Sequence, residues 1–421
     1  MGLGVVGGGV AQTLLGRCDG ISKKAGHPIR LKKILVRDGS KPRDPAAPPK
    51  LITTDPEEIL ADPEIQLVVE VIGGVQPATR YLQAALSAGK HVVTANKEAM
   101  AKHGPQLMAL AQQKRVNLLF EASAGGGIPI VTCLMHELLA NDVRSVRSII
   151  NGTTNYILTR MAHQHTGFQQ ALKEAQERGY AEADPTNDVE GHDAAYKLAI
   201  LATLAFHTRV PPDDIYRQGI SRLEAQDFRY AQELGYAIKS LATATLQDGA
   251  IQAHVYPALV PLDHMLAKVD GVYNAVEVDG SLTGKVLFHG MGAGRGPTTS
   301  AVVGDIIEVA RQLGTDTHPV PVTRLDQKFH VQPIDDLQSR YYLRLNVADR
   351  AGVLAQIARI LGDGNISIAS VLQKDTNPDE QTAEIVITTH PSREASVQQA
   401  LRLMSNLEVV CEVKNLLRIE G

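Results

Sequence analysis

The first 140 residues alternate short, β-branched apolar runs with longer helical segments. Four runs predict buried parallel strands: LKKILVR (31–37), LVVEVIG (67–73), KHVVTA (90–95) and VNLLFEAS (116–123). Helical patterns fill 77–88 and 98–113 between them. Such alternation is typical of βαβ units, so residues 1–140 are predicted to form a doubly wound α/β domain.

The pattern changes after residue 140. SVRSIINGT predicts a strand, helices follow to about residue 217, and alternating apolar segments return near 238–260 and 276–289. This mixture predicts an α+β domain over 141–318. Its last helix, 298–315, is expected to pack back on the first domain.

A third pattern fills 339–421. It runs strand (YYLRLNVAD), helix (GVLAQIARILGDG), strand (ISIASVLQK), strand (TAEIVITTH), helix (REASVQQALRLMSN) and strand (VVCEVKNLLRIE). The order βαββαβ predicts a ferredoxin-like sandwich. The polar, proline-bearing segment 319–338 before it is predicted to be a linker.

Composition removes several function classes. The 421 residues carry a formal net charge of −4 and no basic stripe, so no nucleic-acid partner is expected. No apolar run reaches the roughly 20 residues of a membrane span, and no signal peptide is recognisable. Three widely spaced cysteines indicate reduced thiols in a cytoplasmic protein.

The opening MGLGVVGGGVAQTLL contains Gly2-x-Gly4-x-x-Gly7, the spacing of a dinucleotide-binding loop. Gly2 would form the tight turn, Gly4 would let the pyrophosphate approach, and Gly7 would let helix and strand pack; Val5 and Val6 complete the loop. The helix that follows would supply N–H donors to the anion. A flexible glycine-rich terminus is the alternative, which the βαβ context disfavours.

The next strand ends in charged residues. Arg37 with Lys41 and Arg43 would clamp a 2′-phosphate, whereas Asp38 would favour a free ribose hydroxyl. The charges favour NADP and leave NAD open; a merely solvated loop is equally compatible. Lys97, after the strand 90–95, falls at the carboxyl edge of the sheet, where ligands bind in open α/β folds.

Two further stretches carry candidate chemistry. Glu121 precedes AGGG, which is either a tight turn or, with backbone carbonyls, a site for a hard cation. GYAEADPTNDVEGHDAAYKLAILATLAF (179–206) concentrates acids ahead of Lys197. Asp193 and Lys197 are four residues apart, on one face of a helix that is apolar nearly all round. Because buried charges need partners, this pair is predicted to face a partner or a polar cleft.

Together these motifs resemble homoserine dehydrogenase, in its monofunctional form with a C-terminal ACT domain. The matching blocks are GLGVVGGGV, VRDGSKPR, VVEVIGG, HVVTANKEAM, EASAGGGIPI, INGTTNYILTRM, GYAEADPTNDVEGHDAAYKLAIL, GMGAGRGPTTSAVVGD and, in the last domain, DRAGVL. The resemblance implies interconversion of L-homoserine and L-aspartate 4-semialdehyde with NAD(P), in threonine, methionine and isoleucine biosynthesis. It also implies that 141–318 is the catalytic and dimerisation domain.

The resemblance also implies residue roles. Lys197 would donate the proton and Lys97 would assist. The remaining candidates are, for substrate, Glu182, Asp188, Asp193, Asn151, Gly152 and Thr153; for cofactor, besides the residues above, Gly73, Thr94, Lys97 and Gly294; and for a structural sodium ion, Glu121 with carbonyls of Ala124, Gly126 and Ile128.

Family members have an apolar strand before the glycine loop, and here only Met1 precedes it. We expect the first domain to lack its central strand as written. An upstream start would supply it, and N-terminal mass spectrometry of the native protein should then find residues before Met1. The alternative is a chain that lacks this strand and is less stable.

The ACT domain is expected to bind an end product, L-threonine, as inhibitor between two such domains, which implies a homodimer or homotetramer. The effector residues would be Asp349, Gly352, Val353, Leu354, Asn365 and Ile366. An oligomerisation module without ligand is the alternative. Two rival functions remain: a non-catalytic amino-acid sensor on a dehydrogenase scaffold, and another NAD(P) oxidoreductase of this fold. The presence of Lys97 and Lys197 opposes the first, and the GYAEADP block opposes the second.

Overall fold

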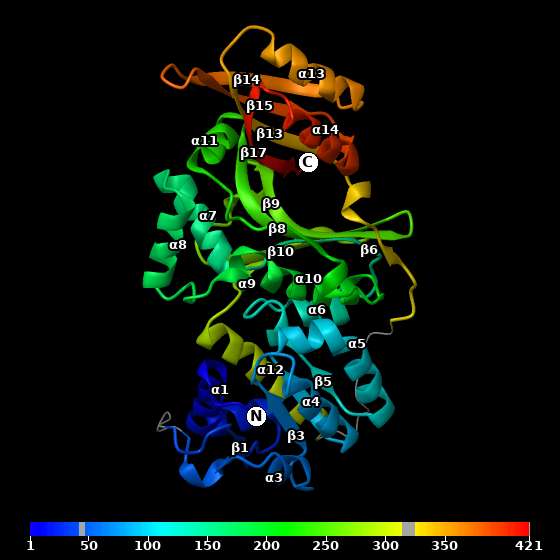
Figure 1. Ribbon diagram of the computed structural model, residues 1–421. Helices are drawn as coiled ribbons and strands as arrows, with labels where there is room; N and C mark the ends of the chain where they lie inside the picture. Colours follow the sequence, from blue (N-terminus) through cyan, green and yellow to red (C-terminus); the bar gives the residue numbers. More distant parts are fainter. Residues whose placement is uncertain (42–46, 314–324, 421) are drawn as a thin grey trace. The chain divides into compact units, whose positions relative to one another are not determined.

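The computed structural model describes residues 1–41, 47–313 and 325–420 (Figure 1). The chain forms two compact units. Unit 1 comprises 1–146, 196–213 and 274–329, and unit 2 comprises 147–195, 214–273 and 330–421, within the described residues. The chain passes from unit 2 back to unit 1 within one helix, α10 (His192–Ala205).

Unit 1 contains the α/β domain. Its helices are α1 (Val5–Gly16), α2 (Cys18–Ala25), α3 (Glu57–Leu60), α4 (Ala78–Ser87), α5 (Lys97–Lys114), α6 (Ile130–Met135), the later part of α10 and α12 (Arg295–Leu313). Its strands are β1 (Ile34–Leu35), β2 (Ile52–Thr53), β3 (Leu67–Glu70), β4 (His91–Thr94), β5 (Leu118–Leu119), the first part of β6 (Val143–Ile149), β10 (Tyr273–Gly280) and β11 (Gly284–Met291).

Unit 2 contains the remaining elements. Its helices are α7 (Gly152–Gln164), α8 (Phe168–Glu177), α9 (Thr186–Val189), the start of α10, α11 (Ala225–Glu233), α13 (Val353–Asp363) and α14 (Glu394–Met404). Its strands are β7 (Tyr216–Arg217), β8 (Tyr236–Gln247), β9 (Ala250–Pro261), β12 (His330–Val331), β13 (Gln338–Ala348), β14 (Ile368–Asn377), β15 (Thr382–Thr389), β16 (Ser392–Arg393) and β17 (Val410–Ile419).

The parallel sheet of unit 1 is interrupted where a central strand was expected to be missing. Strands β3, β4 and β5 pair in parallel, and β1 and β2 form a separate two-stranded sheet among the described residues. Met1 and Gly2 lie in the gap between the two sheets. The Gly2 N–H donates to the Leu35 carbonyl (3.0 Å), and the Val71 N–H donates to the Met1 carbonyl (3.0 Å). Because these two residues offer so few partners, β1 is much shorter than the predicted 31–37.

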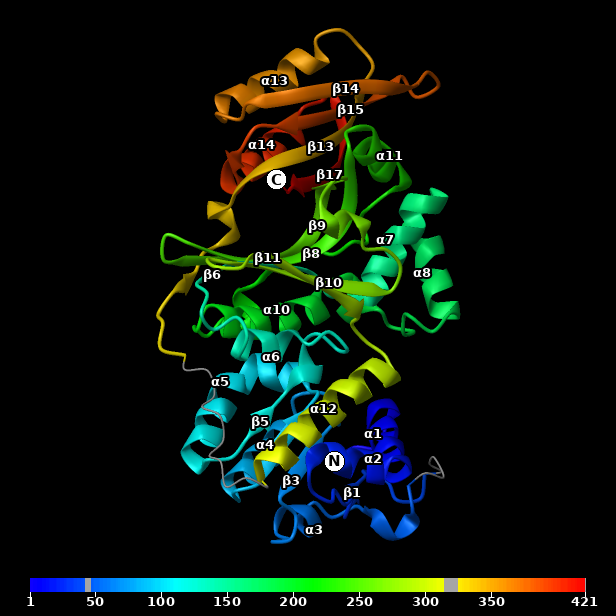
Figure 2. The ribbon, with the colours of Figure 1, turned by 180° about the vertical axis from the view of Figure 1, so that it is seen from behind.

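Helix α12 packs on the first domain, against α1 and α2 (Figure 2). Its apolar residues Val302, Ile306 and Val309 share a core with Val10 of α1 and Val93 of β4. Residues 314–315 of the predicted helix lie outside the described residues, as do 319–324 of the predicted linker. Further along, the linker segment pairs with β9 through β12.

The C-terminal residues of unit 2 form the predicted ferredoxin-like domain. Its strands run antiparallel in the order β17-β13-β15-β14, and α13 packs against α14. Tyr341, Leu343 and Leu345 of β13 face this helix layer in one apolar core. The predicted fold class is therefore confirmed in all three parts.

The other face of this sheet is covered by the rest of unit 2. Strand β17 pairs in parallel with β9, which joins the ferredoxin-like sheet to the β8–β9 hairpin. Tyr342 and Leu417 belong to a second core with residues of α7 and α11. Strands from the predicted ranges 141–318 and 339–421 thus belong to one continuous sheet.

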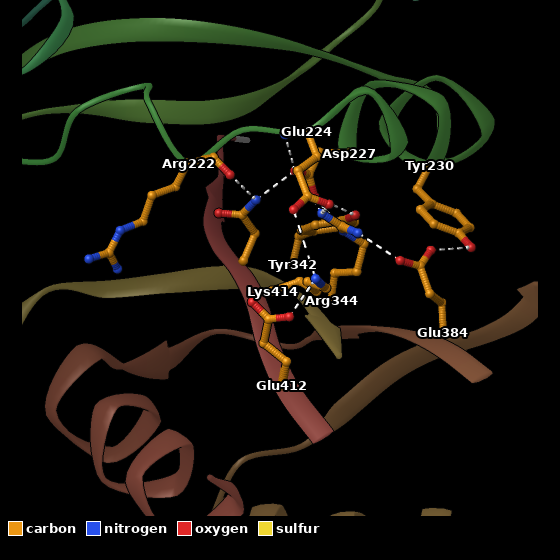
Figure 3. Close-up of polar contacts among 10 residues, drawn as sticks. Arg222, Glu224, Asp227, Tyr230, Tyr342, Arg344, Glu384, Glu412 and Lys414 are labelled. Carbon is orange, nitrogen blue, oxygen red and sulfur yellow. Dashed lines mark hydrogen bonds and ion pairs between the residues drawn. The ribbon is translucent and has the colours of Figure 1, made fainter. Parts of the chain in front are cut away.

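A buried charge cluster lies at this junction (Figure 3). Arg344 of β13 is fully buried and forms ion pairs at 2.8 Å with Asp227, Glu224 and Glu384. Asp227 of α11 is also fully buried and accepts a hydrogen bond from Asn415 at 2.6 Å. Burial alone would lower the pKa of the Arg344 guanidinium, but the neighbouring carboxylates raise it further than burial lowers it. The guanidinium therefore stays charged inside the cluster.

Candidate active site

The glycine loop has the geometry that dinucleotide binding requires. Gly2 has a φ of +95°, and a Cβ there would lie 2.8 Å from the Val71 carbonyl oxygen. A Cβ on Gly7 would lie 2.2 Å from the Gly2 oxygen, so helix and loop pack backbone to backbone. Nothing lies within 4 Å of a Cβ on Gly4, which caps α1. The open position at the helix N-terminus is therefore where an anion has room to approach.

A buried carboxylate that the sequence reading missed organises the edge of the sheet beside this loop. Glu70, at the end of β3, is fully buried. Its carboxylate accepts hydrogen bonds from the Ile72 N–H (2.7 Å) and the Thr94 hydroxyl (2.6 Å). Gly73 follows with a φ of +83°. Glu70 thus fixes the turn that leads to Gly73, and it binds Thr94 at the end of β4. Both are predicted cofactor residues.

Lys97 begins α5 at the carboxyl edge of β4, as predicted. Asn96 caps the helix by accepting the Ala99 N–H at 3.0 Å, and its amide donates to the Gly74 carbonyl at 2.7 Å. Lys97 itself is half-buried. The cap and the Glu70 contacts therefore fix the backbone from which the Lys97 side chain projects.

Two of the three residues predicted to bind a 2′-phosphate lie within the described residues. Arg37 and Lys41 are exposed, and Arg43 lies outside the described residues. Asp38 accepts the N–H and the hydroxyl of Ser40, at 2.9 and 2.7 Å, which orders the turn after the strand. Exposed cations next to an ordered turn are accessible to a phosphate.

In unit 2, Asn151 brings two of the predicted substrate residues together. Its side-chain oxygen caps α7 by accepting the Thr154 N–H, and its amide donates to Asp188 (2.7 Å) and Asp193 (2.9 Å). Asn151 and Asp193 are 6% and 3% exposed, so both acids are held at a largely buried amide. Two carboxylates placed in this way suit an amino or hydroxyl group of a small polar ligand.

Lys197 lies one turn after Asp193 in α10 and is 8% exposed. The following residues Leu198, Leu201 and Leu204 are at most 2% exposed. The predicted all-round apolar helix is therefore confirmed. An ammonium at this position is largely shielded from bulk water, which strengthens its electrostatic effect on a nearby oxygen.

The other substrate candidates lie around α7 and α9. Gly152 and Thr153 open α7, and the Thr153 hydroxyl donates to the Tyr180 carbonyl at 2.7 Å. Glu182 is exposed, and among the described residues its carboxylate makes no hydrogen bond or ion pair. The structure therefore groups Asn151, Asp188 and Asp193, and it leaves Glu182 outside that group.

The glycine-rich turn after β5 packs against a second glycine-rich segment. A Cβ on Gly126 would lie 2.1 Å from the Gly292 oxygen, and the Gly127 N–H donates to the Met291 carbonyl at 3.0 Å. Gly294, with a φ of +110°, follows just before α12. Close backbone approach thus explains Gly126 independently of any cation.

Glu121 has a partner that the sequence reading did not predict. It is 7% exposed, and it accepts the N–H groups of Val131 and Thr132 and the Thr132 hydroxyl at 2.5–2.9 Å. Among the described residues no three His, Cys, Asp or Glu side chains form a metal-ligand group. A carboxylate offers about four lone-pair positions, and these three hydrogen bonds use all but about one of them. The remaining position and the carbonyls of Ala124, Gly126 and Ile128 are the candidate ligands of the predicted cation. An oxygen-only set of this kind fits a hard cation.

Asp305 of α12 is a second buried acid beside Glu121. It is 8% exposed and accepts the Glu121 N–H at 3.1 Å. Burial, with the Glu121 carboxylate nearby, raises the pKa of the Asp305 carboxyl to about 8. The folded state therefore holds this proton up to a higher pH than the unfolded chain does.

This difference predicts a pH-dependent loss of stability. The folded pKa lies above the unfolded one, so the contribution of Asp305 is fully present below about pH 4 and is lost as the pH rises to about 8. We expect Asp305→Asn, which can still accept the Glu121 N–H, to remove a slope of about 1 kcal/mol per pH unit. Thermal unfolding at pH 5 and pH 8 measures this. The variant should gain stability relative to the parent at pH 8 more than at pH 5. The same stability difference at both pH values would contradict the prediction.

The predicted effector residues divide into two groups. Val353 and Ile366 are 4% and 3% exposed and belong to the ferredoxin-like core. Asp349, Gly352, Leu354 and Asn365 are exposed around the start and the end of α13. Only the second group presents side chains or backbone to a ligand.

Dinucleotide binding and proton transfer are the two requirements of a nicotinamide-dependent dehydrogenase. The glycine loop has the backbone geometry that suits the first, and the shielded Lys197 is the candidate proton donor for the second. The fold and the site thus define an enzyme of that class with a C-terminal ACT-type domain.

Comparisons with known proteins narrow this class. Residues 2–121 match the family model "Homoserine dehydrogenase, NAD binding domain", residues 129–307 match "Homoserine dehydrogenase", and residues 341–409 match "ACT domain". A homoserine dehydrogenase of Neisseria gonorrhoeae is 41% identical, covering 100% of this chain and 98% of the relative.

Solved structures agree. The crystal structure of a homoserine dehydrogenase from Thiobacillus denitrificans has a TM-score of 0.91 at 42% identity, covering 100% of this chain and 97% of that one. A hyperthermophilic archaeal homoserine dehydrogenase in complex with NADPH has a TM-score of 0.59 at 25% identity, covering 77% and 98%. The chain belongs to the homoserine dehydrogenase family, and it is an oxidoreductase with an ACT domain. The non-catalytic rival is thereby excluded.

One further finding concerns membranes. Within the described residues, no helix combines the length and the apolar character that crossing a membrane requires. The domain limits 1–140, 141–318 and 339–421 and the cytoplasmic location stay predictions.

Proposed function

We propose that the chain interconverts L-homoserine and L-aspartate 4-semialdehyde with NAD(P), a step in threonine, methionine and isoleucine biosynthesis. The observation that carries this proposal is the pair of Asp193, bound to Asn151, and Lys197 one turn later in a buried helix. The pair offers a carboxylate for the polar groups of a small amino acid and an ammonium for a carbonyl oxygen.

In the proposed mechanism the nicotinamide supplies the hydride chemistry when it is bound. Lys197 donates a proton to the forming alkoxide and stabilises its charge. Asp193 and Asp188 bind the substrate amino and hydroxyl groups, with Asn151 keeping the two acids together. Glu182 contributes after a movement that brings its exposed side chain to the substrate. Lys97 assists from the start of α5.

We propose NADP as the preferred cofactor. Arg37 and Lys41 are exposed beside the turn that Asp38 orders, and Arg43 adds a third cation in the sequence. The NADPH complex of the archaeal relative supports the same choice. Asp38 keeps NAD open, because a carboxylate there suits a ribose hydroxyl.

The test is absorbance at 340 nm with aspartate semialdehyde and either reduced nucleotide. We expect turnover with both, and a kcat/KM about tenfold or more higher with NADPH, since one charge-assisted contact is worth roughly 1.5–3 kcal/mol. No turnover with either nucleotide would refute the function, and equal kcat/KM values would refute the preference.

Each of the remaining proposals has its own test. We propose that Glu121 with carbonyls of Ala124, Gly126 and Ile128 holds a structural sodium ion, so exchanging Na⁺ for a bulky organic cation should lower thermal stability. We propose that L-threonine inhibits through the exposed residues around α13, in a homodimer or homotetramer that brings two ACT domains together. Equal rates at zero and millimolar threonine would remove the regulatory claim, and light scattering measures the oligomer.

A further inference from the structure

Gln218 connects the last strand of the ACT domain to the loop that follows β7. Its side-chain amide donates to the Leu416 carbonyl at 3.5 Å, and its side-chain oxygen accepts from the Arg418 guanidinium. Its backbone N–H donates to the Val255 carbonyl at 2.8 Å. One side chain therefore bridges β17 and the loop that starts at Gly219.

Arg418 is a rigid partner for this contact. It is 1% exposed and forms an ion pair with Glu394 of α14. Its guanidinium also lies over the rings of Tyr216 and Tyr256, at 5.4 and 5.0 Å. The position of Arg418 is therefore set by the ACT domain and by β7 and β9. Arg418 in turn fixes the Gln218 side chain that accepts its hydrogen bond.

The residues after Gln218 contact the turn that carries a substrate residue. The Ile220 N–H donates to the Val189 carbonyl at 2.9 Å, and the Ser221 hydroxyl donates to Glu190 at 2.9 Å. A Cβ on Gly219 would lie 2.2 Å from a Glu190 carboxylate oxygen. These contacts fix the end of α9, and α9 carries Asp188, which Asn151 binds.

Hydrogen bonds and one buried side chain hold this loop, since Ile220 is 1% exposed and lies in the same core as Val189. A cavity of about 390 Å³ lies beside it, lined by Gly219, Ser221 and Arg222 on one side and by Gln398 and Lys414 of the ACT domain on the other. Because Gly219, Ser221 and Arg222 have open space beside them, we expect loss of the Gln218 contacts to let this side of the loop shift around the buried Ile220. A shift would move Val189 and Glu190, and Asp188 with them.

We propose that Gln218 is a positioning residue through which the ACT domain sets the place of Asp188 in the substrate group. This inference rests on the proposed function, in which Asp188 binds the substrate. Gln218 acts through Gly219–Ser221 and the end of α9, and it does not contact substrate itself.

Two substitutions of Gln218 separate its hydrogen bonds from its volume. Gln218→Met keeps the size and removes both side-chain bonds, whereas Gln218→Glu keeps the acceptor for Arg418. We expect Gln218→Met to raise the KM for aspartate semialdehyde about five- to tenfold, with kcat and the nucleotide KM within about twofold of the parent. Gln218→Glu should stay within about twofold in all three.

Lys374→Met is the matched control at the same junction, because the exposed Lys374–Glu233 ion pair (2.7 Å) does not involve the loop. It should leave the substrate KM unchanged. Gly219→Ala perturbs the loop from the other side by displacing the Glu190 carboxylate, and it should raise the substrate KM in the same way. An unchanged KM in Gln218→Met, or an equal rise in Lys374→Met, would overturn the proposal.

Hydrogen exchange gives a readout that does not need turnover. Amides of residues 186–193 should exchange faster in Gln218→Met than in the parent, and not in Lys374→Met. If the parent lacks activity with both nucleotides, the proposed function fails, and exchange still decides whether Gln218 positions α9. Unaltered exchange at 186–193 in Gln218→Met would count against the positioning role.

Discussion

Lys197→Met is expected to lower kcat for the reduction of aspartate semialdehyde by about a thousandfold or more. Loss of a general acid typically costs 10²–10⁴-fold, and loss of the charge that stabilises the alkoxide adds to this. Lys197 is 8% exposed, so water has little access to replace it as proton donor. Methionine retains the buried alkyl stem, which keeps α10 packed against its neighbours.

The controls for this prediction distinguish chemistry from folding. Nucleotide binding, followed by the fluorescence of NADPH, should be unchanged in Lys197→Met. Lys173→Met, on the exposed surface of α8, should turn over like the parent. Lys97→Met should fall between the two, since Lys97 only assists. A Lys197→Met enzyme with more than a tenth of the parental kcat would remove Lys197 from the proton transfer.

Patterns with a strong physical requirement were predictable from the sequence. The spacing of Gly2, Gly4 and Gly7 anticipated one backbone turn with positive φ, one open position and one close contact, and the structure has all three. The all-round apolar character after Lys197 anticipated a buried helix. In each case the constraint is local, so neighbouring residues alone reveal it.

Buried acids were missed because their partners are distant in the chain. Glu70 stands in the apolar run LVVEVIG, and Asp305 in the apolar helix SAVVGDII. A single carboxylate in such a run is a signal, since burying it without partners is costly. The partners are Thr94 for Glu70 and the backbone of Glu121 for Asp305, which only the fold brings near. The sequence therefore shows that these two carboxylates need partners, but it does not show which residues the partners are.

The same reasoning applies to Arg344 in the strand YYLRLNVAD. Alternation places Tyr341, Leu343 and Leu345 on one face, and leaves Tyr342 and Arg344 on the other. The sequence pattern does not reveal which part of the chain covers this second face. In the structure α11 and β8–β9 of the same unit cover it, and Arg344 becomes fully buried.

Arg344→Met is therefore expected to destabilise unit 2 by about 3–5 kcal/mol, the usual effect of removing one partner from a buried ion pair. Asp227 is fully buried and would lose the guanidinium that lies 2.8 Å away. Its remaining partners, the Asn415 amide at 2.6 Å, the Glu224 N–H at 2.9 Å and the Tyr342 hydroxyl at 3.3 Å, are neutral and compensate only in part. Urea unfolding followed by circular dichroism measures the change.

A double-mutant cycle shows whether the uncompensated charge is the cause. Asp227→Asn in the Arg344→Met background removes that charge while keeping an acceptor for the Glu224 N–H that caps α11, so it should recover about half of the loss. Lys374→Met, which breaks an exposed ion pair at the same junction, should cost less than about 1 kcal/mol. If Arg344→Met cost no more than Lys374→Met, the buried cluster would contribute no more than a surface pair, and packing alone would hold the ACT sheet to β9.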